Sequence, residues 1–309
     1  MSMKFVIARP TCGLGNRLRN MACAYALHKM VGGDMFICWE RSEDCDVEWS
    51  SLVDENKFPL KNIRISDVLD MYPRCNPWHD PTTHTDHVLQ TICGGAYDSI
   101  IVEGGHDFKH PDMPVSKLLG YKHEFYTMIK DNLSEKTKGM LRAVDDIRFP
   151  RIGVHMREHI PFFDLQDKLF FEKDTIVEST IAYMKGFVNQ GMKRFFLSTS
   201  SDEYVDKIKK EFADTEDVEI STLNQDLDKR SRSDTSICAS LVDMVVLSRC
   251  SYIVGSYMSS FSDEAALMGN VVKICSTAFD HKKEPYHMYG FYVSQDGLQC
   301  INPNAKHKP

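Results

Sequence analysis

Short apolar runs alternate with amphipathic stretches through the second half of the chain. The runs are expected to form strands over 151–157, 194–200, 218–222, 251–256 and 270–276. The stretches between them are expected to form helices over roughly 174–189, 202–213, 236–250 and 259–269. Continuously apolar strands that alternate with helices are typical of a parallel sheet covered on both faces. This half is therefore predicted to be an α/β domain.

The first half begins with the same alternation. Strands are expected over 4–8, 34–40 and 99–105, and helices over roughly 16–31, 114–133 and 134–146. The segment 42–98 is irregular and rich in His, Pro and Asp. The strand–helix pattern then restarts at 151.

That restart predicts two Rossmann-like domains. The expected division is an N-terminal domain over 1–147, a nucleotide-binding domain over 148–277, and a tail over 278–309 that packs back on the first domain.

The composition is that of an ordinary globular protein, with 42% hydrophobic and 26% charged residues in 309. Lys and Arg number 37 against 44 Asp and Glu, so the formal net charge is −7. An acidic chain argues against duplex nucleic acid as the main partner, although a local basic pocket can still take a small anion.

The cysteines and the apolar stretches bear on the compartment. Ten cysteines lie at irregular spacing without a C-x-x-C pair, which favours small buried side chains over disulfides or a zinc site. The longest apolar stretches, such as 241–247, are far shorter than the roughly 20 residues of a membrane span. The first residues lack the features of a secretory signal, so a soluble cytoplasmic protein is expected.

The first candidate site is the loop RPTCGLGNRLRN at 9–20, between a strand and a helix. Gly13 and Gly15 allow a tight turn and a close approach to a ligand. One interpretation is a dinucleotide fingerprint with Glu40 as the ribose-binding acid, and it predicts an NAD(P)-dependent oxidoreductase. The third glycine of that fingerprint is replaced by Leu18.

Polar side chains crowd the first turn of the helix that follows this loop. Arg17 and Arg19 oppose the helix dipole there, at about 0.3–1 kcal/mol each when nothing compensates. An anionic ligand would compensate, with Asn16 beside it. Two solvated arginines after a tight turn explain the same pattern.

The second and third candidates follow strands of the second half. His155 and Arg157 share one face at the carboxyl end of a strand, where ligands bind in open parallel sheets. Arginine offers a planar fork suited to phosphate, whereas a core histidine and a structural ion pair are the alternative. The serine-rich turn at 259–262 can hold a phosphate or cap a helix, and Ser260 with Asp263 is a variant capping box.

The fourth candidate is TSSDE at 199–203, after another strand of the second half. Ser200, Ser201 and Asp202 can contact a base or a ribose. A simple helix cap by Ser201 or Asp202 explains them as well.

Taken in order, the GLGNR loop, the H-x-R strand end and the SSFS turn resemble the fucosyltransferase-like glycosyltransferases. That group includes the protein O-fucosyltransferases, the core α1,6-fucosyltransferases and the rhizobial nodulation fucosyltransferase. This chain is similar to their microbial, algal or viral relatives in three stretches of sequence, GLGNRLRNMACAYAL, CWE and LVDMVVLSRCSYIVGSYMSSFSDEA. The resemblance covers the glycine loop and most of 151–270, and it is thin over 42–146.

The resemblance implies a GT-B fold of two facing Rossmann-like domains. It also implies inverting, metal-independent transfer from a nucleotide sugar, usually GDP-fucose, to a glycan acceptor, without a cofactor. Arg157 would hold the donor diphosphate with His155 beside it. Further donor contacts are implied for Ser259, Ser260, Phe261, Ser201, Asp202, Asn16 and Arg17, and for the glycines Gly13 and Gly15.

The sequence departs from these relatives after Arg157. They usually read H-x-R-R-x-D or H-x-R-x-x-D, and this chain reads HMREHIPFFD. The missing second arginine leaves UDP-xylose or another UDP-sugar as an alternative donor. An inverting enzyme also needs a base for the acceptor hydroxyl, and Asp164 is preferred over Glu158 and His159.

Metal sites and aromatic stacking are further possibilities. The pairs Asp44–Asp46 and Asp226–Asp228 match a D-x-D pattern but lack its usual context, so no metal is expected. A polar acceptor loop is favoured over zinc for His79, Asp80, His84, Asp86 and His87. The tryptophans Trp39, Trp49 and Trp78 are expected in the core, with stacking on an acceptor sugar as the alternative.

A non-catalytic nucleotide- or glycan-binding protein is the third hypothesis of function.

Overall fold

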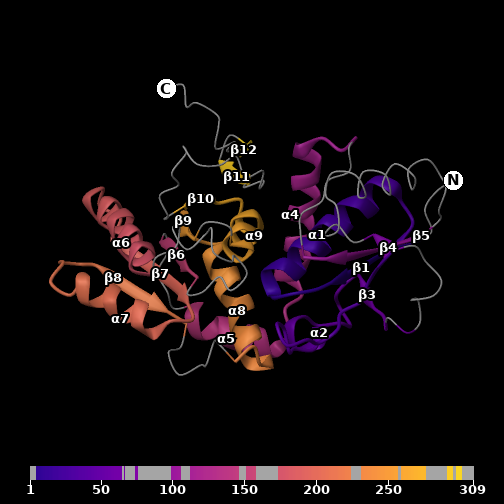
Figure 1. Ribbon diagram of the computed structural model, residues 1–309, viewed down its shortest axis with the longest axis horizontal. Coiled ribbons are helices and arrows are strands. Elements are labelled where there is room, and N and C mark those ends of the chain that lie inside the picture. Colours follow the sequence, from indigo (N-terminus) through magenta and orange to yellow (C-terminus); the bar gives the residue numbers. More distant parts are fainter. Residues whose placement is uncertain are drawn as a thin grey trace. The chain divides into compact units, whose positions relative to one another are not determined.

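The computed structural model describes residues 5–64, 66, 74–75, 99–105, 112–145, 151–157, 173–223, 231–256, 259–275, 291–294 and 297–300. The chain forms two compact units (Figure 1). The first comprises Met1–Met140 and Ser231–Val242, and the second comprises Leu141–Arg230 and Asp243–Pro309.

The first unit is built on a parallel sheet in the order β3-β2-β1-β5-β4. Its central strand β1 (Phe5–Pro10) pairs with β2 (Asp34–Ile37) and β5 (Ser99–Gly104). The two short outer strands are β3 (Lys61–Asn62) and β4 (Arg74–Cys75). The sequence did not predict these two strands or the short helix α2 (Trp49–Leu52), because the surrounding segment has no apolar periodicity.

Helix α1 (Leu14–Val31) follows β1 and packs against it and against α4 (Val115–Asp131). Its residues are buried from Leu14 to Leu27, except Asn16, because small alanines let neighbouring elements approach on every side. Gly32, with φ of 79°, ends the helix in a conformation that disfavours other residues.

Aromatic rings fill the core of the first unit. Trp39, Trp49 and Phe58 contact one another in sequence, at centroid distances of 5.1 and 5.3 Å. Only 6% of Trp39 and 1% of Trp49 is exposed. The core prediction is therefore confirmed for both, and stacking on an acceptor sugar is wrong for them. Trp78 lies outside the described residues.

The second unit has a parallel sheet in the order β10-β9-β6-β7-β8. These strands are β6 (Ile152–Met156), β7 (Arg194–Thr199), β8 (Glu219–Thr222), β9 (Tyr252–Gly255) and β10 (Val272–Cys275). Its helices are α6 (Lys173–Asn189), α7 (Asp202–Glu211) and α9 (Ser260–Gly269). Helix α8 (Asp234–Leu247) belongs to the first unit up to Val242 and to the second unit from Asp243. The α/β prediction is confirmed in both units, with boundaries close to those that the periodicity indicates.

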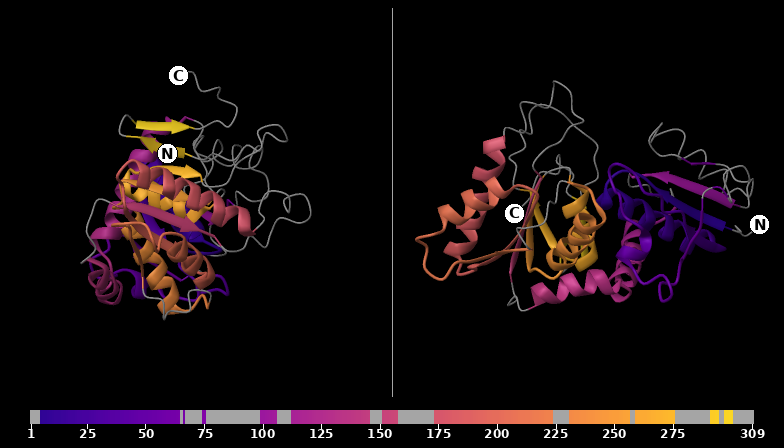
Figure 2. Two further views of the ribbon diagram at one scale, coloured as in Figure 1. Left: turned by 90° about the vertical axis from the view of Figure 1, so that its left-hand side faces the viewer. Right: turned by 90° about the horizontal axis from the view of Figure 1, so that it is seen from below.

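Helices cover both faces of this second sheet (Figure 2). Val154 and Leu197 share a core cluster with Met184 of α6 and Ile208 of α7. Gly153 faces the opposite side, where a Cβ would lie 2.7 Å from Leu247 of α8. Glycine at 153 thus allows α8 to approach the sheet closely.

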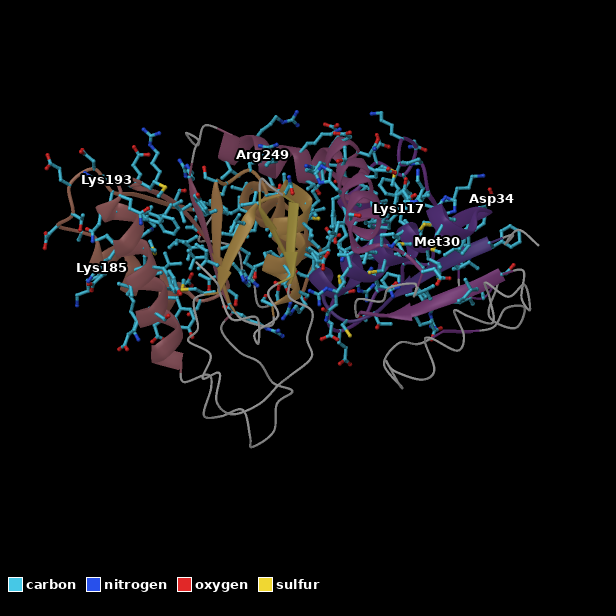
Figure 3. All side chains as sticks on the ribbon, turned by 90° about the horizontal axis from the view of Figure 1, so that it is seen from above. Met30, Asp34, Lys117, Lys185, Lys193 and Arg249 are labelled. Atoms are coloured by element: carbon cyan, nitrogen blue, oxygen red, sulfur yellow. The ribbon has the colours of Figure 1, made fainter. Side chains whose placement is uncertain are left out.

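The outer surface of the second unit carries ion pairs. Lys185 of α6, labelled in Figure 3, pairs with Glu211 of α7. Lys193, before β7, lies 3.6 Å from Asp217. Both pairs are largely exposed, so each contributes little to stability.

The remaining described elements are α5 (Glu135–Asp145) and an antiparallel pair, β11 (Phe291–Ser294) with β12 (Gly297–Cys300). The pair is yellow in the left view of Figure 2. None of the described helices combines the length and hydrophobicity that a bilayer crossing requires.

Cys12, Cys23, Cys38, Cys45, Cys238 and Cys250 are free thiols. Cys23, Cys38, Cys45, Cys238 and Cys250 are buried, as predicted, and Cys12 is half-buried. Burial raises the pKa of Cys45 to about 11 and that of Cys250 to about 12. These two thiols therefore stay protonated near neutral pH and are inert.

Candidate functional site

The strand order of the second sheet marks where a ligand would bind in that unit. β6 is central, the chain continues through β7 and β8 on one side, and it later adds β9 and β10 on the other. The order therefore reverses between β6 and β9. Open α/β sheets bind ligands at the carboxyl ends of the two strands that flank such a reversal.

Ser256 joins those two strand ends. Its backbone N–H donates to the His155 carbonyl at 3.1 Å, and its hydroxyl donates to the same oxygen at 3.4 Å. That hydroxyl also accepts from the Arg157 backbone N–H at 2.9 Å. Ser256 is 2% exposed, so a buried side chain fixes the backbone on both sides of Met156. Sequence reasoning did not assign this serine.

The second and third candidates from the sequence meet at this edge. The His155 ring stacks on the Phe261 ring, with centroids 4.8 Å apart and planes inclined by 22°. His155 is 8% exposed, whereas Arg157 and Phe261 are half-buried. The structure thus brings the H-x-R strand end and the SSFS turn into contact.

Helix α9 opens at this edge with Ser259 as its N-cap. Ser259 is 2% exposed, and its side chain makes no capping hydrogen bond within the described part of the chain. The predicted capping box of Ser260 and Asp263 is wrong, because the cap is one residue earlier and Asp263 bonds to Lys273. The first-turn amides of a helix have no intrahelical acceptor, so such an end suits an anion.

The fourth candidate lies beside this edge, at the carboxyl end of β7. Ser201 is the N-cap of α7 and accepts from the Tyr204 backbone N–H at 3.4 Å. It is 1% exposed, and its capping hydrogen bond is the outcome that the helix-cap interpretation predicts. Asp202 is exposed in the first turn of the helix.

A buried carboxylate lies one strand away from His155. Ser198 of β7 is the register partner of His155, and its hydroxyl donates to Asp243 of α8 at 2.9 Å. Ser198 and Asp243 are each 2% exposed. An aspartate inside the apolar run LVDMVV was the available signal for it, because charged groups are rarely buried without a specific partner.

The glycine loop of the first unit is held by Arg17. The guanidinium donates to the Cys12 carbonyl at 2.7 Å, the Glu40 carbonyl at 2.6 Å and the Ser42 hydroxyl at 2.8 Å. It lies 4.7 Å over the Trp39 ring, and burial lowers its pKa. Arg17 is 2% exposed. The structure therefore places it inside the unit, where it binds the loop, although the resemblance implied a donor contact.

The other residues of this loop lie at the ends of β1 and β5. Gly13 is half-buried as the N-cap of α1, and Gly15 is buried within that helix. Asn16 is half-buried, and a Cβ on Gly105 would lie only 2.7 Å from the Asn16 Cβ. Gly105 thus lets Asn16 pack closely after β5.

A charged cluster occupies the same edge of the first sheet. Arg9 donates to Glu40 at 2.9 Å and to Glu103 at 2.7 Å. Burial opposes the charge on Arg9, but the two carboxylates outweigh it and raise its pKa. Since Glu40 is bound to Arg9 and Leu18 is buried in α1, this edge does not favour the dinucleotide interpretation.

The described residues do not support the metal-binding alternatives. The Asp46 side chain is 50% exposed and accepts a hydrogen bond from Arg41 at 2.6 Å. Among the described ranges, no group of three or more His, Cys, Asp or Glu could hold a metal ion. The candidate bases Glu158, His159 and Asp164 lie outside the described residues, as do Asp226, Asp228 and the histidine-rich segment 79–87.

Several solved structures have a fold similar to that of this chain over most of its length. A mutant of Arabidopsis thaliana FUT1 in complex with GDP matches 88% of this chain and 70% of its own, with a TM-score of 0.64 and 13% identity. Fucosyltransferase NodZ from Bradyrhizobium matches 89% of this chain and 96% of its own, at 0.58 and 15%. POFUT1 in complex with GDP matches 88% and 96%, at 0.52 and 11%.

The chain has the fold of the fucosyltransferases. The GT-B prediction is thereby confirmed. No family model and no curated protein matches the sequence itself. A further NodZ structure, described as an α-1,6-fucosyltransferase, was soaked with GDP-fucose. The fucosyltransferase fold thus agrees with the resemblance that the GLGNR, H-x-R and SSFS motifs carry.

Proposed function

We propose that this chain is an inverting, metal-independent glycosyltransferase that moves a sugar from a nucleoside diphosphate sugar to a glycan hydroxyl. GDP-fucose is the first-choice donor. One observation carries the proposal. In a chain with the fucosyltransferase fold, His155, Arg157, Ser256 and the start of α9 gather at the carboxyl ends of β6 and β9.

The chemistry explains why these groups suit a diphosphate. In the transfer, the bond between the sugar C1 and the phosphate oxygen breaks while the acceptor oxygen bonds to C1. The leaving diphosphate gains negative charge as this happens. Fixed donors that point at developing charge stabilise the transition state, and Arg157 with the α9 amides would supply them. The acceptor proton would pass to a carboxylate, with Asp164 preferred over Glu158.

Substitution of Arg157 tests the proposal directly. We expect Arg157→Ala to reduce nucleotide release from GDP-fucose, measured with a panel of oligosaccharide acceptors, by about a hundredfold or more. Arg194→Ala is the matched control, because Arg194 begins β7 at the opposite edge of the same sheet. Unchanged transfer and unchanged nucleotide affinity in Arg157→Ala would overturn the proposed role.

A UDP-sugar such as UDP-xylose is the second candidate donor. The observation that favours it is Glu158, which stands where many relatives carry a second arginine. Transfer from GDP-fucose and from UDP-xylose is to be compared at equal concentration with EDTA present. Turnover from UDP-xylose alone would move the assignment to the second donor, and loss of all turnover in EDTA would contradict metal independence.

A further inference from the structure

A buried lysine lies beneath the candidate site in the second unit. Lys273 belongs to β10, and its side chain is 3% exposed. Its ammonium donates to the Ser256 carbonyl at 3.0 Å and to an Asp263 carboxylate oxygen at 2.5 Å. A charged amine is rarely buried without such partners, so the sheet holds this cation at a specific point.

Gly255 makes this placement possible. A Cβ on Gly255 would lie 2.7 Å from the Lys273 Cε and 2.8 Å from the Ser262 hydroxyl. The lysine stem therefore crosses the strand over a glycine and carries its ammonium toward the carboxyl end of β9. Alanine at this position would push the stem or α9 away.

Lys273 is linked through a single residue, Ser256, to the backbone of Arg157. The ammonium fixes the Ser256 carbonyl, and the Ser256 hydroxyl accepts from the Arg157 N–H. One lysine thus connects β10 and α9 to the turn that holds the end of β6.

The positive charge of Lys273 also acts on Asp263, at the start of α9. Asp263 lies four residues after the N-cap Ser259, about 6 Å along the helix axis. A carboxylate there stabilises an empty helix N-terminus, but it would repel a phosphate bound at the same end. The ammonium of Lys273 cancels that negative charge from within the sheet.

We propose that Lys273 is a positioning residue for the donor diphosphate: it neutralises Asp263 at the start of α9 and fixes the Ser256 turn that sets Arg157. This inference rests on the proposed function, because it takes a nucleoside diphosphate as the ligand of this edge. It adds a residue that neither the motifs nor the resemblance assigned.

The test uses opposite charge changes in the full-length chain. GDP, UDP and their nucleosides, guanosine and uridine, are titrated into the wild type, Lys273→Met, Asp263→Asn and the double variant. Lys273→Met exposes the Asp263 charge, so we expect about tenfold weaker binding of the preferred diphosphate, and a smaller loss at high salt. The nucleoside affinity should hardly change.

Asp263→Asn separates charge from simple damage to the fold. It removes the repelling carboxylate, so diphosphate binding should be at least as tight as in the wild type. The double variant should bind the diphosphate more tightly than Lys273→Met, because it lacks the repelling carboxylate, and any remaining loss measures the missing bond to the Ser256 carbonyl. A urea unfolding curve for each variant reports its stability separately.

The possible results show whether the inference about Lys273 fails alone or together with the proposed function. If Asp263→Asn weakens diphosphate binding as much as Lys273→Met, or if nucleoside binding falls equally, Lys273 is merely structural and this inference is overturned. If the wild type binds neither GDP nor UDP, the proposed function fails first and this inference falls with it.

Discussion

Removal of the Ser256 hydroxyl is the most informative perturbation of the second unit, because that oxygen joins two strand ends. Ser256→Ala deletes an acceptor for the Arg157 N–H at 2.9 Å and a weaker bond to the His155 carbonyl at 3.4 Å. Ser256 is 2% exposed, so little water is available to replace its oxygen. A donor left without an acceptor in such a place costs about 1–3 kcal/mol.

We therefore expect Ser256→Ala to lower the free energy of unfolding by about 2 kcal/mol, roughly thirtyfold in the folding equilibrium. Urea denaturation measures that change. In the surviving folded protein, affinity for GDP should fall about tenfold, because a hydrogen bond to a charged group is worth about 1.5–3 kcal/mol and a shifted Arg157 would lose about 1.4 kcal/mol of it. Isothermal titration measures the affinity.

Ser262→Ala is the matched control for stability. Ser262 is fully buried, and its hydroxyl donates to the Ser259 carbonyl at 3.3 Å. That carbonyl still accepts the Asp263 N–H after the substitution, so no group is orphaned and the change should be small. Equal losses of stability in the two variants would refute the reasoning about Ser256.

Two further predictions concern the first unit. Arg17→Met should lower its stability by about 2–4 kcal/mol, because three bonded oxygens lose a buried donor; urea denaturation checks this, and a loss no greater than that of the exposed Arg41→Ala would contradict it. Burial opposes ionisation of Asp234, but hydrogen bonds from Lys136 and Ser51 outweigh it and hold the pKa of this carboxyl below 3.8. The ionised group therefore stabilises the fold above pH 3.8, and this contribution is lost as the pH falls through the lowered pKa. Urea curves should show Asp234→Asn less stable than the wild type at pH 7 and equal to it in acid, and a gap that persists in acid would contradict this account.

Much of the fold follows from local pattern. The predicted helix over 202–213 is α7 (Asp202–Glu211), and the predicted strand over 194–200 is β7 (Arg194–Thr199). Apolar runs and helical periodicity encode such elements directly. The strands β3 and β4 span two residues each, so they exist only through pairing with β2 and β5. No local pattern encodes that pairing.

Sequence spacing predicted Arg157 as a residue of the candidate site, but it did not predict the hydrogen bonds that join this region to other strands. The position of Arg157 directly after an apolar strand predicted that it lies at the carboxyl end of that strand, and the structure places it just after β6. Arg17 carries the same charge, yet it is buried and bonded to the loop, because long-range contacts with Glu40 and Ser42 decide its place. Ser256 and Lys273 gain their roles from neighbours on other strands, which sequence spacing cannot reveal.

Nucleotide binding by the wild-type chain tests the central claim most directly. Thermal unfolding is to be followed with GDP, UDP or NAD, each with EDTA present. A ligand at 100 times its dissociation constant adds about 2.7 kcal/mol of stability, which shifts the melting temperature visibly. Our account predicts stabilisation by GDP, or by UDP if the donor is a UDP-sugar. Stabilisation by NAD alone, or by none of the three, would contradict it.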